Sequence, residues 1–248
     1  RVDGLIWMVG PLDGAPLAEV VAAGLPTVVS AGPVPEGIAH IRAIPTAPGA
    51  KTYGQATRDA VQHLIDLGHH RLAYVTETPD DQTVQDRVAA FHGAIAEAGL
   101  PADAGIVRTR AEIRTHKLEG GYRAMRELLA EGAAPTAVCT SSDLAAIGVL
   151  RALREHGLDV PGDVSVVGCD DILQASYTDP PLTTIRTPYA ATSAAALATL
   201  RDLIGAKPGA PDVRQDGFAL IVRESTGAAP GLASPAGTRR GLKGGRGR

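Results

Sequence analysis

The chain has 248 residues, which is enough for one large domain or two small ones, each with its own hydrophobic core. Hydrophobic residues make up 44% of the chain, which excludes a disordered protein, and the formal net charge of -3 provides no general attraction to nucleic acid or acidic membranes. We find no apolar stretch long enough for a transmembrane helix and recognise no signal peptide. Cys139 and Cys169 lie in or beside apolar runs, as buried reduced thiols do, so we expect a cytoplasmic protein.

Short apolar runs alternate with helical patterns along most of the chain, and a glycine or proline follows most of the helical patterns. Runs of Val and Ile that are apolar on both faces are typical of parallel strands covered by helices. The sequence therefore predicts an α/β protein. In chain order, the predicted strands are 4–9, 27–30, 38–44, 71–76, 105–109, 136–140, 164–168 and 218–222, and the predicted helices are 15–23, 53–67, 84–98, 118–131, 144–156 and 189–204.

The last stretch, residues 227–248, differs from the rest in composition. It is rich in Gly, Ala, Pro and Arg and shows no periodicity, so we predict that it is a disordered basic tail. It contains no acidic residue, and its basic residues are Arg239, Arg240, Lys243, Arg246 and Arg248.

Polar residues follow three of the predicted strands at the points where those strands end. The clusters are Glu77–Asp80, Ser141–Asp143 and Asp170-Asp171, and Arg87 lies on the helix after the first cluster. Ligands of open α/β sheets bind beyond the carboxyl ends of parallel strands, where these side chains would meet. Carboxylates accept hydrogen bonds from hydroxyl groups and a guanidinium donates several, so the set suits a polyhydroxylated ligand.

Each of these residues also has a simpler interpretation. Ser142 or Asp143 could cap the helix that begins near Leu144, and Asp171 could cap a short turn at 172–175. Arg87 could be a solvated helix residue. His69-His70 stands at a predicted helix end, where a positive charge is favourable, and we prefer that interpretation to a metal site.

Several motifs occur in one order along the chain: "GHHRLAYV", "RVAAFHGAIAEAGL", "PTAVCTSSDLAAIGVLRALREHGLDVPGDVSVVGCDD", "DPPLTTI" and "IVRESTG". Together they resemble the effector-binding core of the lactose-repressor (LacI/GalR) family of bacterial transcription regulators, from about Val2 to Thr226. The resemblance implies a type I periplasmic-binding-protein-like α/β fold. In it, two Rossmann-like parallel-sheet subdomains are joined by crossover strands, and a small ligand binds between them.

The resemblance also implies a division of the chain. Residues 1–68 and 187–217 would form the N-terminal subdomain, which would be incomplete because Val2–Trp7 resembles a later strand. Residues 69–186 and 218–226 would form the C-terminal subdomain. Thr183–Ile185, after the turn at Pro180-Pro181, would be a crossover strand.

The effector contacts implied by the family fall on six positions. Asp170 and Arg87 match the family's effector-contacting aspartate and arginine, and Ser142 stands where many members have an asparagine. His116 falls at a pocket position that is often aromatic, although a surface histidine is the alternative. Thr187 and Tyr189 follow the crossover, where pocket residues are expected, although Tyr189 could instead pack at the helix start. Near Thr52-Tyr53 many members have an Asp-Asn-like pair, which this chain lacks.

The implied function is a ligand-responsive transcription regulator whose effector is a sugar or another small polar molecule. Members read operator DNA through an N-terminal helix-turn-helix that is missing from this sequence, so it resembles an N-terminally truncated regulator. Members also pair side by side, and we expect a homodimer with Leu144, Ile147 and Leu150 in the interface. The alternative is a periplasmic sugar-binding protein of a transport system, which shares the fold.

An enzyme is the third possibility, and the sequence argues against it. Asp170 and Asp171 are adjacent in the chain and so do not form an opposed acid/base pair. We find no Ser-His-Asp, zinc or phosphate-loop motif. We therefore expect no catalytic residues, no metal and no cofactor.

Overall fold

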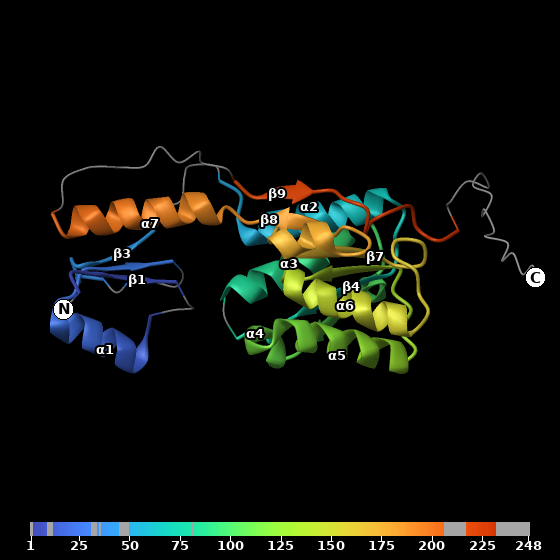
Figure 1. Cartoon of the computed structure of the whole chain (residues 1–248), viewed down its shortest axis with the longest axis horizontal. Coiled ribbons are helices and arrows are strands. Elements are labelled where there is room, and N and C mark those ends of the chain that lie inside the picture. The colour runs from blue at the N-terminus through green and yellow to red at the C-terminus, as the bar shows by residue number, and fades with distance from the viewer. Residues whose placement is uncertain are drawn as a thin grey trace, which may run out of the picture.

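The computed structural model describes residues 2–8, 12–30, 34, 36–44, 50–80, 82–205 and 217–231. These residues form two α/β bodies, one built on a three-stranded sheet and the other on a six-stranded sheet (Figure 1). Within those ranges no helix combines the length and the apolar character that crossing a membrane requires.

The smaller body is a parallel sheet between two helices. Its strands run in the order β1 (Leu5–Trp7), β2 (Thr27–Val29) and β3 (Ile41–Ala43). Helix α1 (Gly14–Ala23) lies on one side of the sheet and α7 (Tyr189–Leu203) on the other (Figure 1). A parallel sheet covered by helices is therefore confirmed here, although each strand is shorter than the predicted apolar run.

The larger sheet has the order β5-β4-β6-β7-β8-β9. All neighbours are parallel except β8 and β9, which are antiparallel. This last pairing differs from the prediction, and it arises because the chain returns from the smaller body along the outer edge of β8. The strands are β4 (Leu72–Thr76), β5 (Gly105–Thr109), β6 (Ala137–Thr140), β7 (Ser165–Asp170), β8 (Thr183–Arg186) and β9 (Ala219–Ile221).

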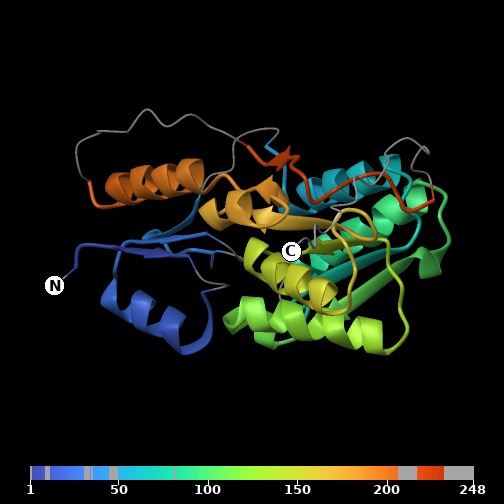
Figure 2. The ribbon, with the colours of Figure 1, turned by 45° about the vertical axis from the view of Figure 1, so that its right-hand side comes forward.

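Alternate residues of the central strands supply two separate cores, as the two-residue period of a strand requires. Leu72 and Tyr74 pack with one helix pair, and Ala73 and Val75 pack with the other. The first pair is α2 (Tyr53–Asp66) and α3 (Gln82–Glu97), and the second is α5 (Lys117–Ala130) and α6 (Asp143–Glu155), which run side by side (Figure 2). The short elements are η1 (Ala102–Ala104), α4 (Glu112–Thr115) and η2 (Leu173–Tyr177).

Strand β8 connects the two bodies as the predicted crossover does, but helix α2 does not follow the predicted subdomain boundary. Strand β8 pairs with β7 and leads directly into α7, which packs on β1 and β2. Helix α2, which the predicted boundary assigns to the first subdomain, packs instead on α3 and contacts β6, β8 and β9. Its apolar stripe, including Val61 and Leu64, could cover either sheet, so the sequence pattern alone does not decide between them.

The start of the predicted disordered tail is ordered, which corrects that prediction for residues 227–231. The Gly227 N–H donates to Ser165 Oγ at 3.0 Å, and the N–H of the buried Ala229 donates to Leu67 O at 2.9 Å. Backbone hydrogen bonds of this kind leave no trace in composition or periodicity. Residues 232–248, with all five basic residues of the tail, lie outside the described part of the chain.

His69 is a core residue and not a charge at a helix end, so that interpretation was wrong. Its side chain is fully buried, with Nδ1 3.1 Å from Thr136 Oγ1 and Nε2 3.0 Å from both Ser165 Oγ and Gly227 O. Burial lowers the pKa of His69, which favours the neutral ring. Over the described ranges, no group of three or more His, Cys, Asp or Glu side chains is arranged to hold a metal ion.

Candidate ligand-binding site

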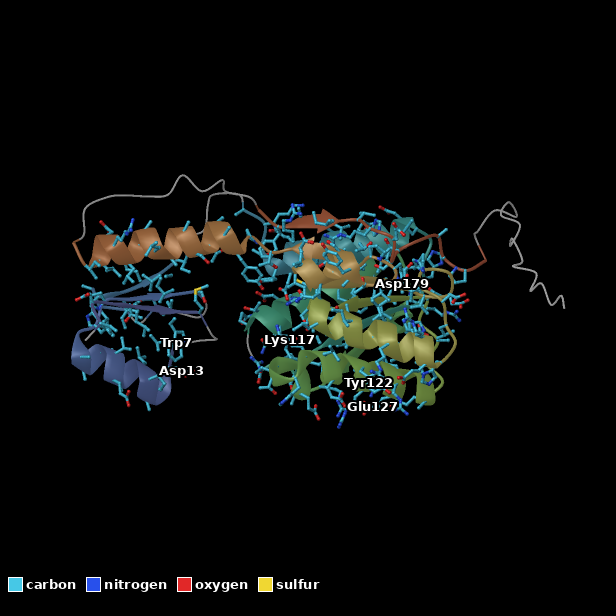
Figure 3. The ribbon with its side chains drawn as sticks, in the orientation of Figure 1. Trp7, Asp13, Lys117, Tyr122, Glu127 and Asp179 are labelled. Carbon is cyan, nitrogen blue, oxygen red and sulfur yellow. The ribbon has the colours of Figure 1, made fainter. Side chains whose placement is uncertain are left out.

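The polar clusters predicted from the sequence meet at the carboxyl edge of the larger sheet. Glu77 follows β4, Ser141 follows β6 and Asp170 ends β7, and these strands are parallel and close in the sheet order. Figure 3 labels Lys117, which begins α5 at this edge, and Trp7, which ends β1, and the two lie on the sides by which the two bodies face each other. The edge therefore lies next to the smaller body, where α7 begins.

Arg87 is buried at this edge, so it is not the solvated helix residue of the alternative interpretation. Its side chain comes from α3, and the whole residue is only 5% exposed. Nη2 donates to the Ser141 carbonyl oxygen at 2.9 Å, and the guanidinium carbon lies 5.1 Å from the centre of the Tyr53 ring. The buried Nε has no hydrogen-bond partner among the described residues. A buried guanidinium with an unused N–H can donate to a ligand.

Asp170 connects the larger sheet to the beginning of α7. Its Oδ1 accepts a hydrogen bond from the Tyr189 hydroxyl at 2.6 Å, and Tyr189 is the first residue of α7. Burial raises the pKa of Asp170, and the Tyr189 hydrogen bond and the charges of Lys117 and Arg87 oppose that shift. Asp170 is thus a half-buried carboxylate held beside the start of α7.

Glu77 supplies the second carboxylate of the site. It is half-buried, and its Oε2 accepts from Thr76 Oγ1 at 3.0 Å. Burial acts to raise the pKa of Glu77, but hydrogen bonds and the positive charge of Arg87 outweigh it, so the pKa is lowered. Arg87 interacts with both Glu77 and Asp170, and Lys117 interacts with Asp170, so the formal charges of these four side chains sum to zero; the buried Asp143, whose pKa is raised, lies beside them.

The remaining predicted contacts have different surroundings. Ser142 is buried, and its Oγ accepts from the Ala145 N–H at 3.3 Å, so the helix-capping interpretation is confirmed. Its neighbour Ser141 is the residue that binds Arg87. His116 is exposed between α4 and α5, with Nδ1 3.0 Å from Thr115 Oγ1. Thr187 is buried next to Cys169 and near the Tyr53 hydroxyl.

Asp171 does not cap a turn, which corrects that alternative. The turn η2 begins at Leu173 after Ile172, and no side chain caps it. Asp171 instead forms ion pairs with Arg186 Nε at 2.7 Å and with Arg223 Nη2 at 2.6 Å. Two cations beside it hold the pKa of Asp171 below its ordinary value in spite of burial.

Tyr53 is the main residue of the site that the sequence did not assign. It lies under the Arg87 guanidinium, and its hydroxyl lies near Thr187 and Tyr189. Burial raises the pKa of this hydroxyl, so it stays protonated and can donate. The available signal was its place directly after the helix-capping Thr52, where the family's Asp-Asn-like pair is absent.

Taken together, the residues can bind a small, hydroxyl-rich molecule by hydrogen bonding. Asp170 and Glu77 accept hydrogen bonds, Arg87 donates them, and the exposed ring of Tyr189 provides a flat apolar surface. Convergent polar groups beside aromatic rings are typical of sites for small molecules.

Comparison with known proteins identifies the family of this chain. Residues 61–226 match the family model described as a periplasmic binding protein-like domain. The HTH-type transcriptional regulator MalR of Streptomyces coelicolor is 40% identical over 173 residues, which are 69% of this chain and 49% of that protein. The chain spans about half the length of the first curated relatives it matches.

Solved structures of LacI family regulators are also similar to this chain. A LacI family transcriptional regulator from Enterococcus faecium with bound ribose superposes with a TM-score of 0.74 at 27% identity, covering 92% of this chain and 80% of that one. A LacI family transcriptional regulator from Lactobacillus casei with bound glucose has a TM-score of 0.67 at 30% identity, covering 91% and 79%. The chain therefore belongs to the periplasmic binding protein-like family, and within it to the effector-binding cores of the LacI/GalR transcriptional regulators.

Proposed function

We propose that this chain binds a sugar or a similar small polar effector and thereby controls a bacterial transcription regulator. The observation that carries the proposal is the buried Arg87 with an unused N–H, close to the carboxylate of Asp170 at the sheet edge. The near-neutral charge of the cluster favours an uncharged, hydroxyl-bearing ligand. The relatives solved with ribose and with glucose support the same ligand class.

Operator DNA is the proposed partner of the whole regulator, and the cytoplasm its proposed location. The alternative, a periplasmic sugar-binding protein, is not favoured, because the curated relatives are transcriptional regulators. The relatives also make a regulator a better assignment than an enzyme.

The first experiment is a thermal-shift screen of the chain with D-glucose, D-ribose, sucrose and matched sugar phosphates. A neutral sugar at about 100 times its Kd should stabilise the protein by about 2.7 kcal/mol, because it binds only the folded state. Isothermal calorimetry then gives the affinity. If no neutral sugar raises the melting temperature while a sugar phosphate does, the argument from a neutral site fails.

We further propose that the chain forms a homodimer through the outer face of α6. Leu144 is exposed on this face, and Ile147 and Leu150 are half-buried. Three large apolar side chains that reach the surface along one helix face are typical of an interaction surface. Leu173 and Tyr177 of η2 are 74% and 79% exposed, and η2 packs through Ala175 on the same core cluster as α6.

Light scattering at micromolar concentration should give twice the chain mass of 25.5 kDa. Replacing Leu144 and Leu173 together by aspartate should give the monomer mass, because two charges would lose water at the interface. A matched pair of aspartates at the exposed Ala96 and His92 on α3, on the other side of the sheet, should leave the dimer intact. A monomer mass for the unchanged chain would contradict the proposal.

A further inference from the structure

The two residues at the end of β7 have a backbone conformation that needs support. Asp170 has φ = 122° and Asp171 has φ = 57°, and both are non-glycine residues. Residues with a Cβ rarely adopt positive φ, and they keep it only where the surrounding structure holds it. Since Asp170 is a carboxylate of the proposed ligand site, whatever holds this turn also sets the direction of that carboxylate.

Asp143 holds the turn from the side of α6. It is fully buried, its Oδ2 accepts from the Ile172 N–H at 2.9 Å, and its Oδ1 accepts from Thr184 Oγ1 at 2.5 Å. Ile172 directly follows the strained pair, and Thr184 lies on the neighbouring strand β8. One carboxylate therefore ties together the start of α6, the turn after β7 and strand β8.

The Asp143 carboxylate fits beside β7 because residue 168 is a glycine and has no side chain. A Cβ at that position would collide with Asp143 Oδ1 and would lie 2.8 Å from Leu182 Cδ2. Gly168 and Asp170 are two residues apart on β7, and Gly168 is paired with Thr184. A side chain at position 168 would thus push Asp143 away from both of its partners.

The turn is held from its other side by the ion pairs of Asp171 with Arg186 and Arg223. Arg223 also donates from Nη1 to the Leu182 carbonyl oxygen at 2.7 Å, which fixes the guanidinium against β8. With Asp171 clamped there and Ile172 bound by Asp143, the backbone of Asp170 has little freedom to rotate. Its side chain is left directed at Tyr189.

We propose that Asp143 is a positioning residue, which keeps Asp170 directed at the ligand without touching the ligand itself. The inference rests on the proposed function of the site. Asp143 is also the first residue of α6, where a negative charge is favourable, so the same carboxylate stabilises the helix end.

The test compares three variants by calorimetry with whichever of D-glucose, D-ribose or sucrose binds the parent. Asp143→Ala removes both hydrogen bonds and should weaken sugar binding at least about tenfold. The calorimetric stoichiometry should remain one sugar per folded chain. In Asp143→Asn the amide oxygen can still accept from Ile172 while its N–H faces Thr184, so the affinity should stay within about threefold of the parent.

The matched control is Ser225→Ala. Ser225 is equally buried and also bridges β7 and β8, since its Oγ donates to Val166 O at 2.6 Å and accepts from Thr183 N–H at 2.8 Å. It does so at the amino end of β8, away from Asp170. The Ser225→Ala variant should therefore have a lower melting temperature than the parent and the same affinity for the sugar. If Asp143→Ala behaves like this control, its role is only structural and the proposal is overturned.

A second measurement works without any ligand. Carboxyl carbon NMR, with Asp170→Asn for assignment, follows the titration of Asp170 itself. Both Asp143→Ala and Asp143→Asn remove the charge of Asp143, which interacts with Asp170, so the two variants are compared with each other. The pKa of Asp170, raised by burial in the parent, should lie nearer the ordinary aspartate value in Asp143→Ala than in Asp143→Asn. If Asp143→Ala does not fold, Thr184→Val removes one of the two contacts and should shift the pKa of Asp170 in the same direction. Equal Asp170 titrations in Asp143→Ala and Asp143→Asn, or an unchanged titration in Thr184→Val, contradict the positioning role.

The two measurements separate the two ideas. If no sugar binds the parent but the titration of Asp170 differs between Asp143→Ala and Asp143→Asn, the proposed function fails and the positioning of Asp170 by Asp143 stands. If a sugar binds the parent and Asp143→Ala changes neither its affinity nor the Asp170 titration, the function stands and the positioning role is wrong.

Discussion

Arg87→Ala and Asp170→Ala should each weaken binding of the sugar found in the screen by about ten- to a hundredfold. A charged hydrogen bond contributes roughly 1.5–3 kcal/mol, which corresponds to that range of affinities. For Arg87 the loss should lie at the upper end, because the residue is only 5% exposed and water has little access to the space that the guanidinium would leave. Calorimetry on the folded variants, with the parent measured in the same buffer, checks both values.

The matched control for Arg87 is Arg126→Ala. Arg126 also lies over a tyrosine, with its guanidinium carbon 5.5 Å from the Tyr122 ring centre, but it is exposed on α5. Asp159→Ala, exposed on the loop before β7, is the control for Asp170. Both controls should bind like the parent. Parental affinity in both Arg87→Ala and Asp170→Ala would show that the ligand site lies elsewhere.

Gly148→Ala should destabilise the fold by about 3 kcal/mol, because it forces α5 and α6 apart. A Cβ at Gly148 would collide with the Leu118 carbonyl oxygen and lie 2.6 Å from the Tyr122 backbone nitrogen. These are backbone atoms, which cannot turn aside as a side chain can. For a protein of this size the melting temperature should fall by roughly 6–12 °C, measured by calorimetry.

Gly162→Ala is the control for this stability change. Gly162 is exposed, and a Cβ there would meet only Asp159 Cβ at 3.4 Å, an ordinary contact distance. Its melting temperature should stay within about a degree of the parent, since surface substitutions usually change stability by less than 0.5 kcal/mol. Equal melting temperatures for both alanine variants would mean that the α5–α6 contact is looser than described.

Most of the regular structure of the larger body could be predicted from the sequence. Local signals are sufficient there: the apolar run at 136–140 and the helical pattern at 144–156 each lie within one residue of β6 and α6. The apolar run at 164–168 located β7 but not its end, because Cys169 and Asp170 continue the strand by pairing with Ile185 and Arg186 of β8. That partner strand is distant in sequence and leaves no local mark.

The sequence also determined part of the site. Asp170 stands out because a charge ends a buried strand, and Arg87 follows the first polar cluster and matches a family contact, although a solvated helix residue remained the simpler interpretation. Composition and periodicity carried no sign that Arg87 is buried, since an arginine on a helix is usually solvated. Only the tertiary structure placed its guanidinium over Tyr53 and against the Ser141 carbonyl oxygen.

The contacts that the tertiary structure alone decided join segments that lie far apart in the chain. Tyr189 meets Asp170 because β8 leads into α7, and Asp143 reaches Ile172 because α6 packs beside β7. Segment 227–231 is ordered by the side chain of Ser165 and the backbone of Leu67. Hydrogen bonds of this kind depend on the meeting of two or three chain segments in space, and no single stretch of sequence encodes such a meeting.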